Sequence, residues 1–394
     1  MHNPRNNLLV AHGGGPTAVL NCSLYGIIRQ AQEADAIRNI LGARFGIEGI
    51  LQGSFIDLGR QSEDTLERLR TSPGSAIGSS RRKILEDDYD RILDVLERHD
   101  VRYVLYNGGN GTMYGAMLLA DAAEHRGYEL GVIGVPKTVD NDLPATDRSP
   151  GYASAARYIA ASVRELGTDV GSLPTPVSIL ETMGRNVGWL AAAAAAARTG
   201  SDTAPHMIYL PEKPFDKDGF LGELNDVLEQ LGWAVVVVSE GLQDAEDNPV
   251  YVTDAVAQAD AVGRILPGGV ASYLADLAAR ELDVRCRSEK PGLCARSSVL
   301  LTSPVDRSDA ECVGRMAVTA AVSGESRKMV ALRPRRTSTE KPLTHLFPLQ
   351  EAANGKKTLP EKFLCEGKSF VADDFLGYLM PLLGPDLPDF LKLF

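Results

Sequence analysis

Residues 130–142 read LGVIGVPKTVDND, an apolar run that passes directly into a loop of polar and charged side chains. The run at 130–133 is typical of a buried strand. Open α/β sheets bind their ligands at the carboxyl ends of the strands, where this loop would lie. We therefore take four of its side chains as candidate site residues: Lys137, Thr138, Asp140 and Asp142. A surface loop with solvated charges is the alternative interpretation of this stretch taken alone.

Composition excludes several classes of protein. A chain of 394 residues, with 44% hydrophobic and 24% charged residues, is expected to form two globular domains. Its net charge of -11, without a block of Lys or Arg, argues against nucleic acid or an anionic membrane as partner. No apolar run is long enough to cross a membrane, and the N-terminus does not resemble a signal peptide. The five scattered cysteines indicate free thiols and a cytoplasmic location.

Predicted strands and helices alternate along the chain. Strands are expected at 8–11, 39–43, 101–106, 130–135, 176–180, 207–210, 234–238, 284–287 and 329–332. The alternation predicts an α/β fold of two lobes, each a mainly parallel sheet flanked by helices. The first lobe is expected over 1–150, completed by part of 265–325, and the second over 151–394. The first helix is expected to follow the glycines at 13–15 directly, with Pro16 in its first turn.

Two glycine-rich turns follow predicted strands. They are Gly13-Gly14-Gly15-Pro16-Thr17 and Gly108-Gly109-Asn110-Gly111-Thr112. A helix N-terminus with bare backbone N–H groups binds phosphate, although glycines also simply permit tight turns. Neither turn is the Gly-x-Gly-x-x-Gly fingerprint of dinucleotide-binding proteins. The candidate phosphate-binding residues are Gly14, Gly15, Gly108, Gly109, Gly111 and Thr112.

Further polar residues follow strands in the second half of the chain. Arg185 is expected at the start of a helix, where a cation opposes the helix dipole and so indicates an anionic ligand. Glu240 follows a buried strand, where it is expected to bind sugar hydroxyls. Arg287 and Arg296 flank a Pro-Gly turn, and Arg81 ends a Gly- and Ser-rich loop.

Together these residues predict phosphoryl transfer. Asp140 is expected to take the proton of an acceptor hydroxyl, and Asp142 with Asn110 to hold Mg²⁺, a hard cation that prefers oxygen ligands. Cationic side chains would offset the charge on the transferring group, which is most of what this catalysis requires. These side chains are Lys137, Arg185 and Arg81.

The motifs resemble those of the phosphofructokinases, most closely the long pyrophosphate-dependent branch. The matching stretches occur in family order, at 106–110, 134–143, 149–152, 183–189, 236–241, 351–354 and 378–382. The resemblance implies two α/β lobes with the active site in the cleft between them. The first lobe would bind the phosphoryl donor, and the second, which carries a C-terminal extension, would bind the sugar. It also implies a phosphotransferase acting on a sugar or sugar phosphate, and a homodimer or homotetramer.

The resemblance also implies roles for single residues. Asp140 would be the general base that deprotonates the sugar 1-hydroxyl. The contacts with the sugar phosphate would come from Thr138, Met183, Gly184, Arg185, Glu240 and Arg296. The phosphoryl donor and the metal would be bound by Gly15, Arg81, Gly109 and Asn110.

Two departures from the family pattern bear on the donor. The pyrophosphate branch carries Asp where this chain has Gly111, whereas the ATP branch has Gly there. Lys137, by contrast, is the residue of the pyrophosphate type, although some ATP enzymes combine Gly with Lys. A missing carboxylate leaves volume for a third phosphate and removes repulsion, so we expect ATP as donor and keep pyrophosphate as the alternative.

Two further departures bear on the acceptor. Pro176 stands where the family has a basic residue for the sugar 6-phosphate, and Leu293 replaces an aromatic residue or His. Arg287 and Arg296 remain as candidate phosphate ligands. The acceptor is thus fructose 6-phosphate or a related sugar, with another sugar or a cyclitol as the alternative. A non-catalytic sensor of sugar phosphates or nucleotides is a third interpretation, which the retained Asp140 argues against.

Overall fold

The structure is a computed structural model that describes residues 6–174, 176–252 and 268–391. The chain forms two compact units. Unit 1 comprises Met1–Ala153, Arg296–Arg335 and Thr339–Lys357, and unit 2 comprises Ser154–Ala295, Arg336–Ser338 and Thr358–Phe394. Residues 339–357 therefore belong to unit 1, which the sequence did not indicate. Which unit binds the donor and which binds the sugar stays a prediction.

Unit 1 is built on a seven-stranded sheet in the order β11-β10-β5-β4-β1-β2-β3. The strands are β1 (Asn6–His12), β2 (Ile37–Ala43), β3 (Phe55–Asp57), β4 (Val101–Gly108), β5 (Gly131–Pro136), β10 (Lys328–Leu332) and β11 (Thr344–Pro348). The pairings of β1 with β2 and β4, of β4 with β5 and of β5 with β10 are parallel. The strand order reverses at β1, so the carboxyl ends of β1 and β4 form the switch point where such sheets bind ligands.

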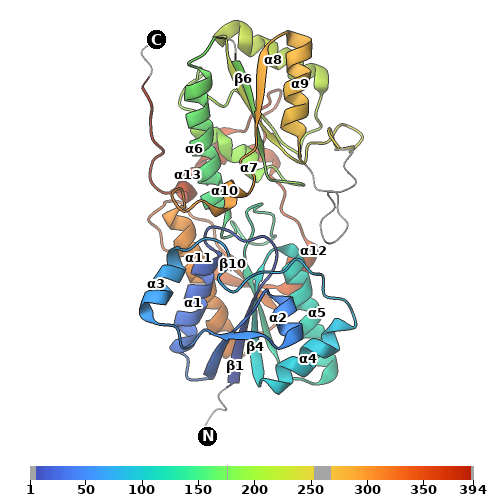
Figure 1. The fold of residues 1–394 in the computed structure, drawn as a ribbon, viewed down its shortest axis with the longest axis vertical. Helices are drawn as coiled ribbons and strands as arrows, with labels where there is room; N and C mark the ends of the chain where they lie inside the picture. Colours follow the sequence, from blue (N-terminus) through green and yellow to red (C-terminus); the bar gives the residue numbers. More distant parts are fainter. Residues whose placement is uncertain (1–5, 175, 253–267, 392–394) are drawn as a thin grey trace. The chain divides into compact units, whose positions relative to one another are not determined.

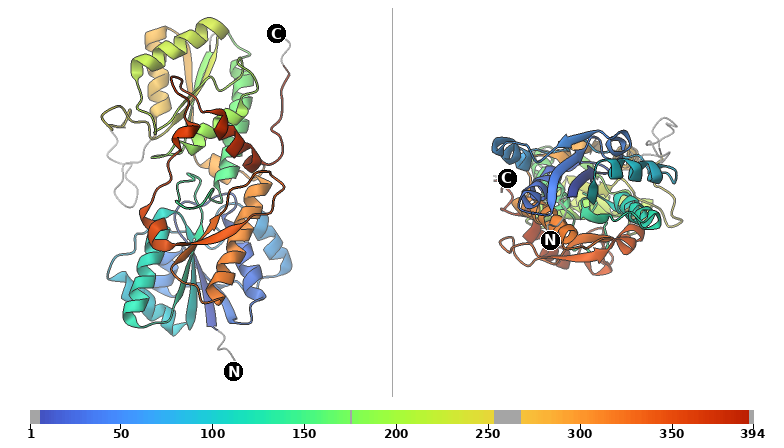
Figure 2. Two further views of the ribbon diagram at one scale, coloured as in Figure 1. Left: turned by 180° about the vertical axis from the view of Figure 1, so that it is seen from behind. Right: turned by 90° about the horizontal axis from the view of Figure 1, so that it is seen from below.

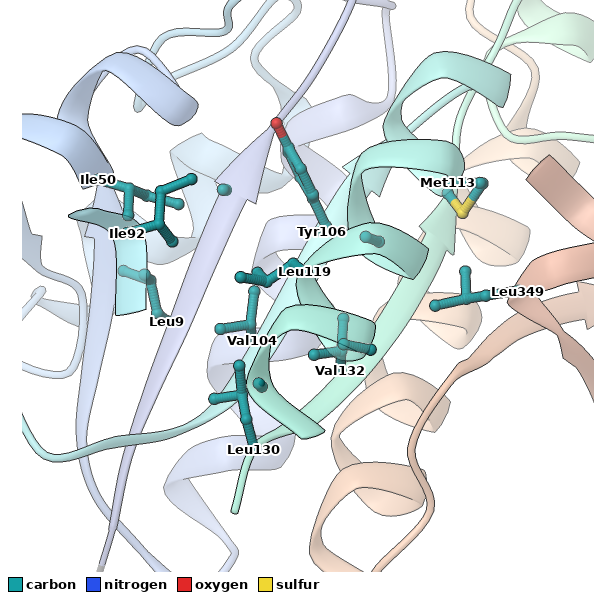
Figure 3. Close-up of a cluster of buried hydrophobic side chains, with 14 of the residues drawn as sticks. Leu9, Ile50, Ile92, Val104, Tyr106, Met113, Leu119, Leu130, Val132 and Leu349 are labelled. Carbon is teal, nitrogen blue, oxygen red and sulfur yellow. The ribbon is translucent and has the colours of Figure 1, made fainter. Parts of the chain in front are cut away.

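Helices cover both faces of this sheet (Figure 1). They are α1 (Leu20–Gln32), α2 (Ile47–Gln52), α3 (Glu63–Thr71), α4 (Asp88–Arg98), α5 (Asn110–Arg126), α11 (Pro304–Val322) and α12 (Leu349–Asn354). On one face Val104 and Val132 pack against Ile92, Leu119 and Leu349 (Figure 3). On the other face, strand residues such as Leu8, Ile133 and Val330 pack against α1, α3 and α11. Burial on both faces explains why these strands appear in the sequence as continuous apolar runs.

The two edge strands of the sheet were not predicted. β3 pairs with β2 and β11 pairs with β10, both antiparallel. Every residue of either strand is only partly buried, so neither forms the apolar run that marks a central strand. β11 leads into α12, and both belong to unit 1 (Figure 2, left).

The start of the first helix was predicted wrongly. α1 begins at Leu20, not directly after the glycines at 13–15. The Thr17 carbonyl, which a longer helix would use internally, accepts the Gly74 N–H at 3.0 Å. The Thr17 hydroxyl also accepts the Val19 N–H at 3.3 Å. Because these partners hold residue 17 outside the helix, the first glycine turn leads into an irregular segment.

Unit 2 contains a four-stranded parallel sheet in the order β7-β8-β6-β9. The strands are β6 (Pro176–Thr182), β7 (Met207–Tyr209), β8 (Ala234–Ser239) and β9 (Arg285–Glu289). The helices of this half of the chain are α6 (Tyr152–Val170), α7 (Trp189–Ala193), α8 (Lys217–Leu231), α9 (Val270–Leu282), α10 (Leu293–Ser297) and α13 (Asp373–Leu383), with 3₁₀ turns at Ala194–Ala197 and Glu361–Phe363. One core joins Val177 and Val236 to Phe220 of α8 and Leu274 of α9. Within the described ranges, no helix is both long and apolar enough to span a bilayer.

Candidate active site

The first glycine turn follows β1 and is tied to two neighbouring segments. The Gly13 N–H donates to the Asn107 carbonyl at 2.9 Å, and the Gly14 N–H donates to the Ser80 carbonyl at 2.8 Å. Gly14 has φ 78°, a left-handed conformation that glycine adopts without strain. The turn is therefore fixed against the end of β4 on one side and against the segment before Arg81 on the other.

Three cations converge on this turn. Lys137, at the end of β5, is 3% exposed. Its Nζ donates to the carbonyls of Gly13 at 2.9 Å and Gly15 at 2.7 Å. A β-carbon at Gly15 would overlap the Arg296 guanidinium and lie 3.4 Å from Nη2 of Arg81. A larger residue at position 15 would therefore displace the Arg296 guanidinium from this cluster, whose excess positive charge fits an anionic ligand.

The charges in this cluster shift one another's protonation. Burial and the nearby Arg296 together lower the pKa of Lys137 to about 7, and Asp140 opposes the shift. Burial, together with Arg81, also lowers the pKa of Arg296, again opposed by Asp140. The Asp140 carboxylate thus acts electrostatically on both cations.

The second glycine turn packs directly against the first. Gly109 is the N-cap of α5, so Asn110 and Gly111 open that helix. The Thr112 side chain occupies the space that β-carbons at Gly13 and Gly108 would need. Around a β-carbon at Gly111, in contrast, no atom of the described residues lies within 4 Å. The two turns thus form one glycine-lined surface, with Thr112 buried inside it and Gly111 facing open space.

The predicted carboxylate loop has an irregular backbone. Asn141 has φ 56°, and its Oδ1 accepts the Ser149 N–H at 3.0 Å and Lys357 Nζ at 3.1 Å. The Asp140 N–H donates to Thr138 Oγ1 at 3.1 Å. Burial raises the pKa of Asp142, and the Thr138 hydroxyl, Lys356 and Lys357 oppose that shift.

The two predicted metal ligands suit a magnesium ion. The Asn110 Nδ2 donates to the Gly355 carbonyl at 3.2 Å. Its Oδ1 is buried without a hydrogen-bond partner among the residues that the structure describes. Over the same residues, no group of three or more His, Cys, Asp and Glu side chains is placed to hold a metal. One amide and one carboxylate still fit Mg²⁺, which keeps several waters and is bound largely by substrate phosphates.

In unit 2 two predicted loops are interlocked. Ser239 Oγ donates to the Gly184 carbonyl at 2.6 Å, and the Gly184 N–H donates to Glu240 Oε1 at 3.3 Å. Gly184 has φ 137°, and a β-carbon there would lie 2.9 Å from Ser239 Oγ. Burial raises the pKa of Glu240, while the Gly184 N–H opposes the shift. Met183, Gly184, Arg185 and Glu240 therefore lie at one end of β6 and β8.

The dipole argument for Arg185 was wrong. α7 begins at Trp189 with Gly188 as N-cap, so Arg185 lies in the preceding loop and opposes no helix dipole. Its role as an anion ligand stays a prediction that rests on the family motif. Arg287 is separated from this loop: it pairs with Ser178, five residues before Met183 on the same strand. At about 3.3 Å per residue, the distance along the strand is roughly 16 Å.

Two residues from later in the chain, Arg296 and Lys357, reach the loops of unit 1. The Arg296 guanidinium lies at Gly15 in the first glycine turn, and its predicted contact with the sugar phosphate stays a prediction. Lys357, which was not predicted at all, contacts the carboxylate loop from 216 positions along the chain. Its pKa is lowered by burial to about 7. The Pro-Gly turn and the family motif marked Arg296 in the sequence, whereas no local pattern marked Lys357.

Comparisons with known proteins identify the chain's relatives. The sequence pattern described as Phosphofructokinase matches residues 7–321. The chain belongs to the phosphofructokinase family. A pyrophosphate--fructose 6-phosphate 1-phosphotransferase from Xanthomonas campestris is 41% identical to this phosphofructokinase-family chain over 97% of it and 92% of the relative. An ATP-dependent 6-phosphofructokinase from Amycolatopsis methanolica is 31% identical over 82% of this chain and 70% of the relative.

A solved structure agrees with this family membership. The pyrophosphate-dependent phosphofructokinase from Marinobacter aquaeolei superposes with a TM-score of 0.87 and 33% identity, covering 98% of this chain and 94% of that one. The predicted family, the α/β fold with mainly parallel sheets and the phosphofructokinase-type phosphotransferase activity are thus confirmed. The roles of the individual site residues stay predictions.

Proposed function

We propose that this phosphotransferase moves a phosphoryl group from ATP to the 1-hydroxyl of fructose 6-phosphate. The observation that carries the proposal is the cluster of Lys137, Arg81 and Arg296 around the first glycine turn, with Asp140 acting on two of these cations. A structural turn does not need three cations, whereas a chain of phosphates does.

The residues of unit 1 suit the steps of this reaction. The bare N–H groups of the two glycine turns bind the donor phosphates. Asp140 takes the proton as the sugar oxygen attacks the terminal phosphorus, and the bond from that phosphorus to ADP breaks. Lys137 and Arg81 offset the charge of the group in transit. Mg²⁺, held by Asn110 and Asp142, would neutralise phosphate charge when bound.

In unit 2, the loops around Gly184 and Glu240 are proposed to bind the sugar phosphate. Arg185 supplies a cation for its phosphate and Glu240 an acceptor for its hydroxyls. This assignment rests on the family motif and on the hydrogen bond between Glu240 and the Gly184 N–H, which ties the two loops together.

The donor assignment rests on Gly111. The open space around a β-carbon there leaves room for a third phosphate, which favours ATP. Pyrophosphate is the second candidate, favoured by Lys137 and by the name of the Xanthomonas relative. The two candidates make opposite predictions for a carboxylate placed at position 111.

Gly111→Asp is therefore expected to separate the donors. A β-carbon at position 111 meets no neighbour within 4 Å among the described residues, and an acidic residue is favourable in the first turn of α5, so the fold should persist. Repulsion of a third phosphate should lower kcat/KM for ATP by about 100-fold, since like charges in contact cost several kcal/mol. The value for pyrophosphate should be unchanged or higher. Gly111→Asn, equal in size but uncharged, is the control, and unaltered ATP turnover in Gly111→Asp would refute the donor argument.

The acceptor is tested by a panel of substrates. Two family contacts to the 6-phosphate are absent, because Pro176 begins β6 and Leu293 is 63% exposed. These replacements favour a different sugar phosphate, a free sugar or a cyclitol as the second candidate. Fructose 6-phosphate, sedoheptulose 7-phosphate, free sugars and inositols should be assayed with both donors. Saturation by fructose 6-phosphate at micromolar KM supports the proposal. Binding of the compounds without turnover of any acceptor supports the alternative that the protein is a non-catalytic sensor.

The pH dependence should report Lys137. Since burial lowers its pKa from about 10.5 to about 7, the cation is lost as pH rises through 7 in the donor-free enzyme. The kcat/KM for the donor should fall above this pH. The corresponding fall in kcat, called the alkaline limb of the pH profile, should lie at higher pH, because a bound polyanion raises the pKa of Lys137 again. Lys137→Arg keeps its charge over this range, so its pH profile should lack the alkaline limb. If the alkaline limb persists in this variant, it comes from another group, such as Lys357.

The remaining features are proposed on similar grounds. Mg²⁺ as metal and a role in carbohydrate phosphorylation, as in glycolysis, follow from the proposed reaction. A cytoplasmic location is supported by the five cysteines, all free thiols. A homodimer or homotetramer is supported only by the family resemblance, and sedimentation or light scattering would test it.

A further inference from the structure

We propose that residues 355–357 form a brace that positions both predicted metal ligands and the loop that carries Asp140. Lys357 is the central positioning residue of this brace. The inference rests on the proposed function for the roles of Asn110, Asp140 and Asp142, but the contacts of the brace do not depend on it.

The first part of the brace holds the carboxylate loop. Lys357 Nζ donates to Asn141 Oδ1 at 3.1 Å and to the carbonyls of Thr146 at 3.0 Å and Asp147 at 2.8 Å. The Lys357 N–H donates to the Asp142 carbonyl at 2.8 Å. An ammonium has three N–H donors, so these three acceptors match its capacity. Lys357 is therefore directed toward the loop itself and not toward a substrate.

The loop has a backbone that needs such support. Asn141 has φ 56° and Ala145 has φ 60°, so two residues other than glycine are left-handed within five positions. Such conformations persist only where the surrounding structure holds them. Lys357 binds one of these residues directly and spans the other by its bonds to residues 141 and 146. Its ammonium thus keeps the backbone around Asp142 in place.

The second part of the brace reaches the glycine turn of α5. The Gly355 carbonyl accepts the Asn110 Nδ2, which leaves Asn110 Oδ1 for a metal. A β-carbon at Gly355 would lie 2.9 Å from Pro144, so this residue also packs against the carboxylate loop. One short segment thus contacts Asn110 on one side and Asn141, Asp142 and Pro144 on the other. The spacing of the two predicted metal ligands depends on it.

Lys357→Met tests the brace, because methionine keeps the length of the side chain and removes its donors. The matched control is Lys341→Met, an exposed lysine of the same unit. Hydrogen exchange of residues 139–148 should accelerate about tenfold in Lys357→Met and stay unchanged in the control. Mn²⁺ affinity, measured by electron paramagnetic resonance, should weaken about 10-fold, as for other residues that hold metal ligands in place.

Turnover should respond in a characteristic way. A displaced loop should lower kcat by about 100-fold, with the donor KM within about threefold. Lys357→Arg keeps the cation and should recover part of the Mn²⁺ affinity. Gly355→Ala changes the other end of the brace and should weaken Mn²⁺ binding without removing a charge, which keeps the test decisive if Lys357→Met does not fold.

The outcomes separate the brace from the proposed function. If hydrogen exchange of 139–148 and Mn²⁺ affinity in Lys357→Met equal those of the control, the brace is refuted, even if the melting temperature falls. A wild type without turnover on any donor and acceptor refutes the proposed function. Hydrogen exchange of residues 139–148 then still tests the brace, because this measurement does not require an active enzyme.

Discussion

Replacing Asp140 by asparagine is expected to lower kcat by about 10²–10⁴-fold, the usual contribution of a general base. The amide keeps the shape of the side chain but cannot take the proton of the sugar hydroxyl. Because substrate contacts come mainly from other residues, the KM values for donor and acceptor should stay within about threefold. Steady-state kinetics together with calorimetric binding of both substrates would measure these quantities.

A second effect of this variant needs to be separated from the loss of the base. Asp140 also opposes the positive charge of Lys137 and Arg296, so Asp140→Asn should strengthen binding of anionic donors slightly. Glu351→Gln, at an exposed carboxylate of α12, is the matched control and should keep wild-type kcat. A fall of less than tenfold in Asp140→Asn would assign the base to another residue.

Asp309→Ala is expected to have the largest effect on stability, a loss of about 3–5 kcal/mol in unfolding free energy. The Asp309 carboxylate is 1% exposed and binds Arg148 at 2.6 Å and Arg335 at 3.0 Å. Both arginine side chains are themselves buried, at 2% and 3% exposure. Removing the carboxylate takes away the partner that the two buried cations share, and neither can lose its proton. The Asp147 carboxylate, 3.2 Å from Arg148, remains and offsets part of the charge.

The measurement is urea unfolding followed by circular dichroism. Arg60→Ala is the control, since its pair with Asp57 at 3.1 Å is exposed and should contribute less than about 1 kcal/mol. Equal effects of Asp309→Ala and Arg60→Ala would mean that the buried triad does not stabilise unit 1. Arg148 also donates to the Arg333 carbonyl at 2.8 Å, so the triad anchors the segment that follows β10.

Local sequence was sufficient for the central strands and for the glycine turns. β5 and β8 are apolar on both faces, and the residues that follow them are polar, so strand and loop were both visible in the sequence. The edge strands β3 and β11 escaped prediction because their residues are only partly buried. The start of α1 was misplaced because its limit is a hydrogen bond from Gly74, which no local propensity reports.

In the candidate site, too, some residues could be predicted from local sequence and others could not. Lys137, Asp140 and Asp142 were found because they follow one strand in one short loop. Arg185 was assigned by an argument about a helix that begins four residues later. Arg296 and Lys357 come from segments that return to unit 1 after the chain has formed most of unit 2, so their place beside Gly15 and Asn141 was not predictable.

The amino-acid sequence by itself determined the α/β class, the family and the position of the two glycine turns of this protein, because apolar runs and glycine spacing act over a few residues. Only the tertiary structure decided which distant cations surround the first glycine turn and that residues 355–357 hold the carboxylate loop. The physical reason is separation along the chain. A lysine that binds an asparagine 216 positions away leaves no periodicity or spacing from which the contact can be predicted.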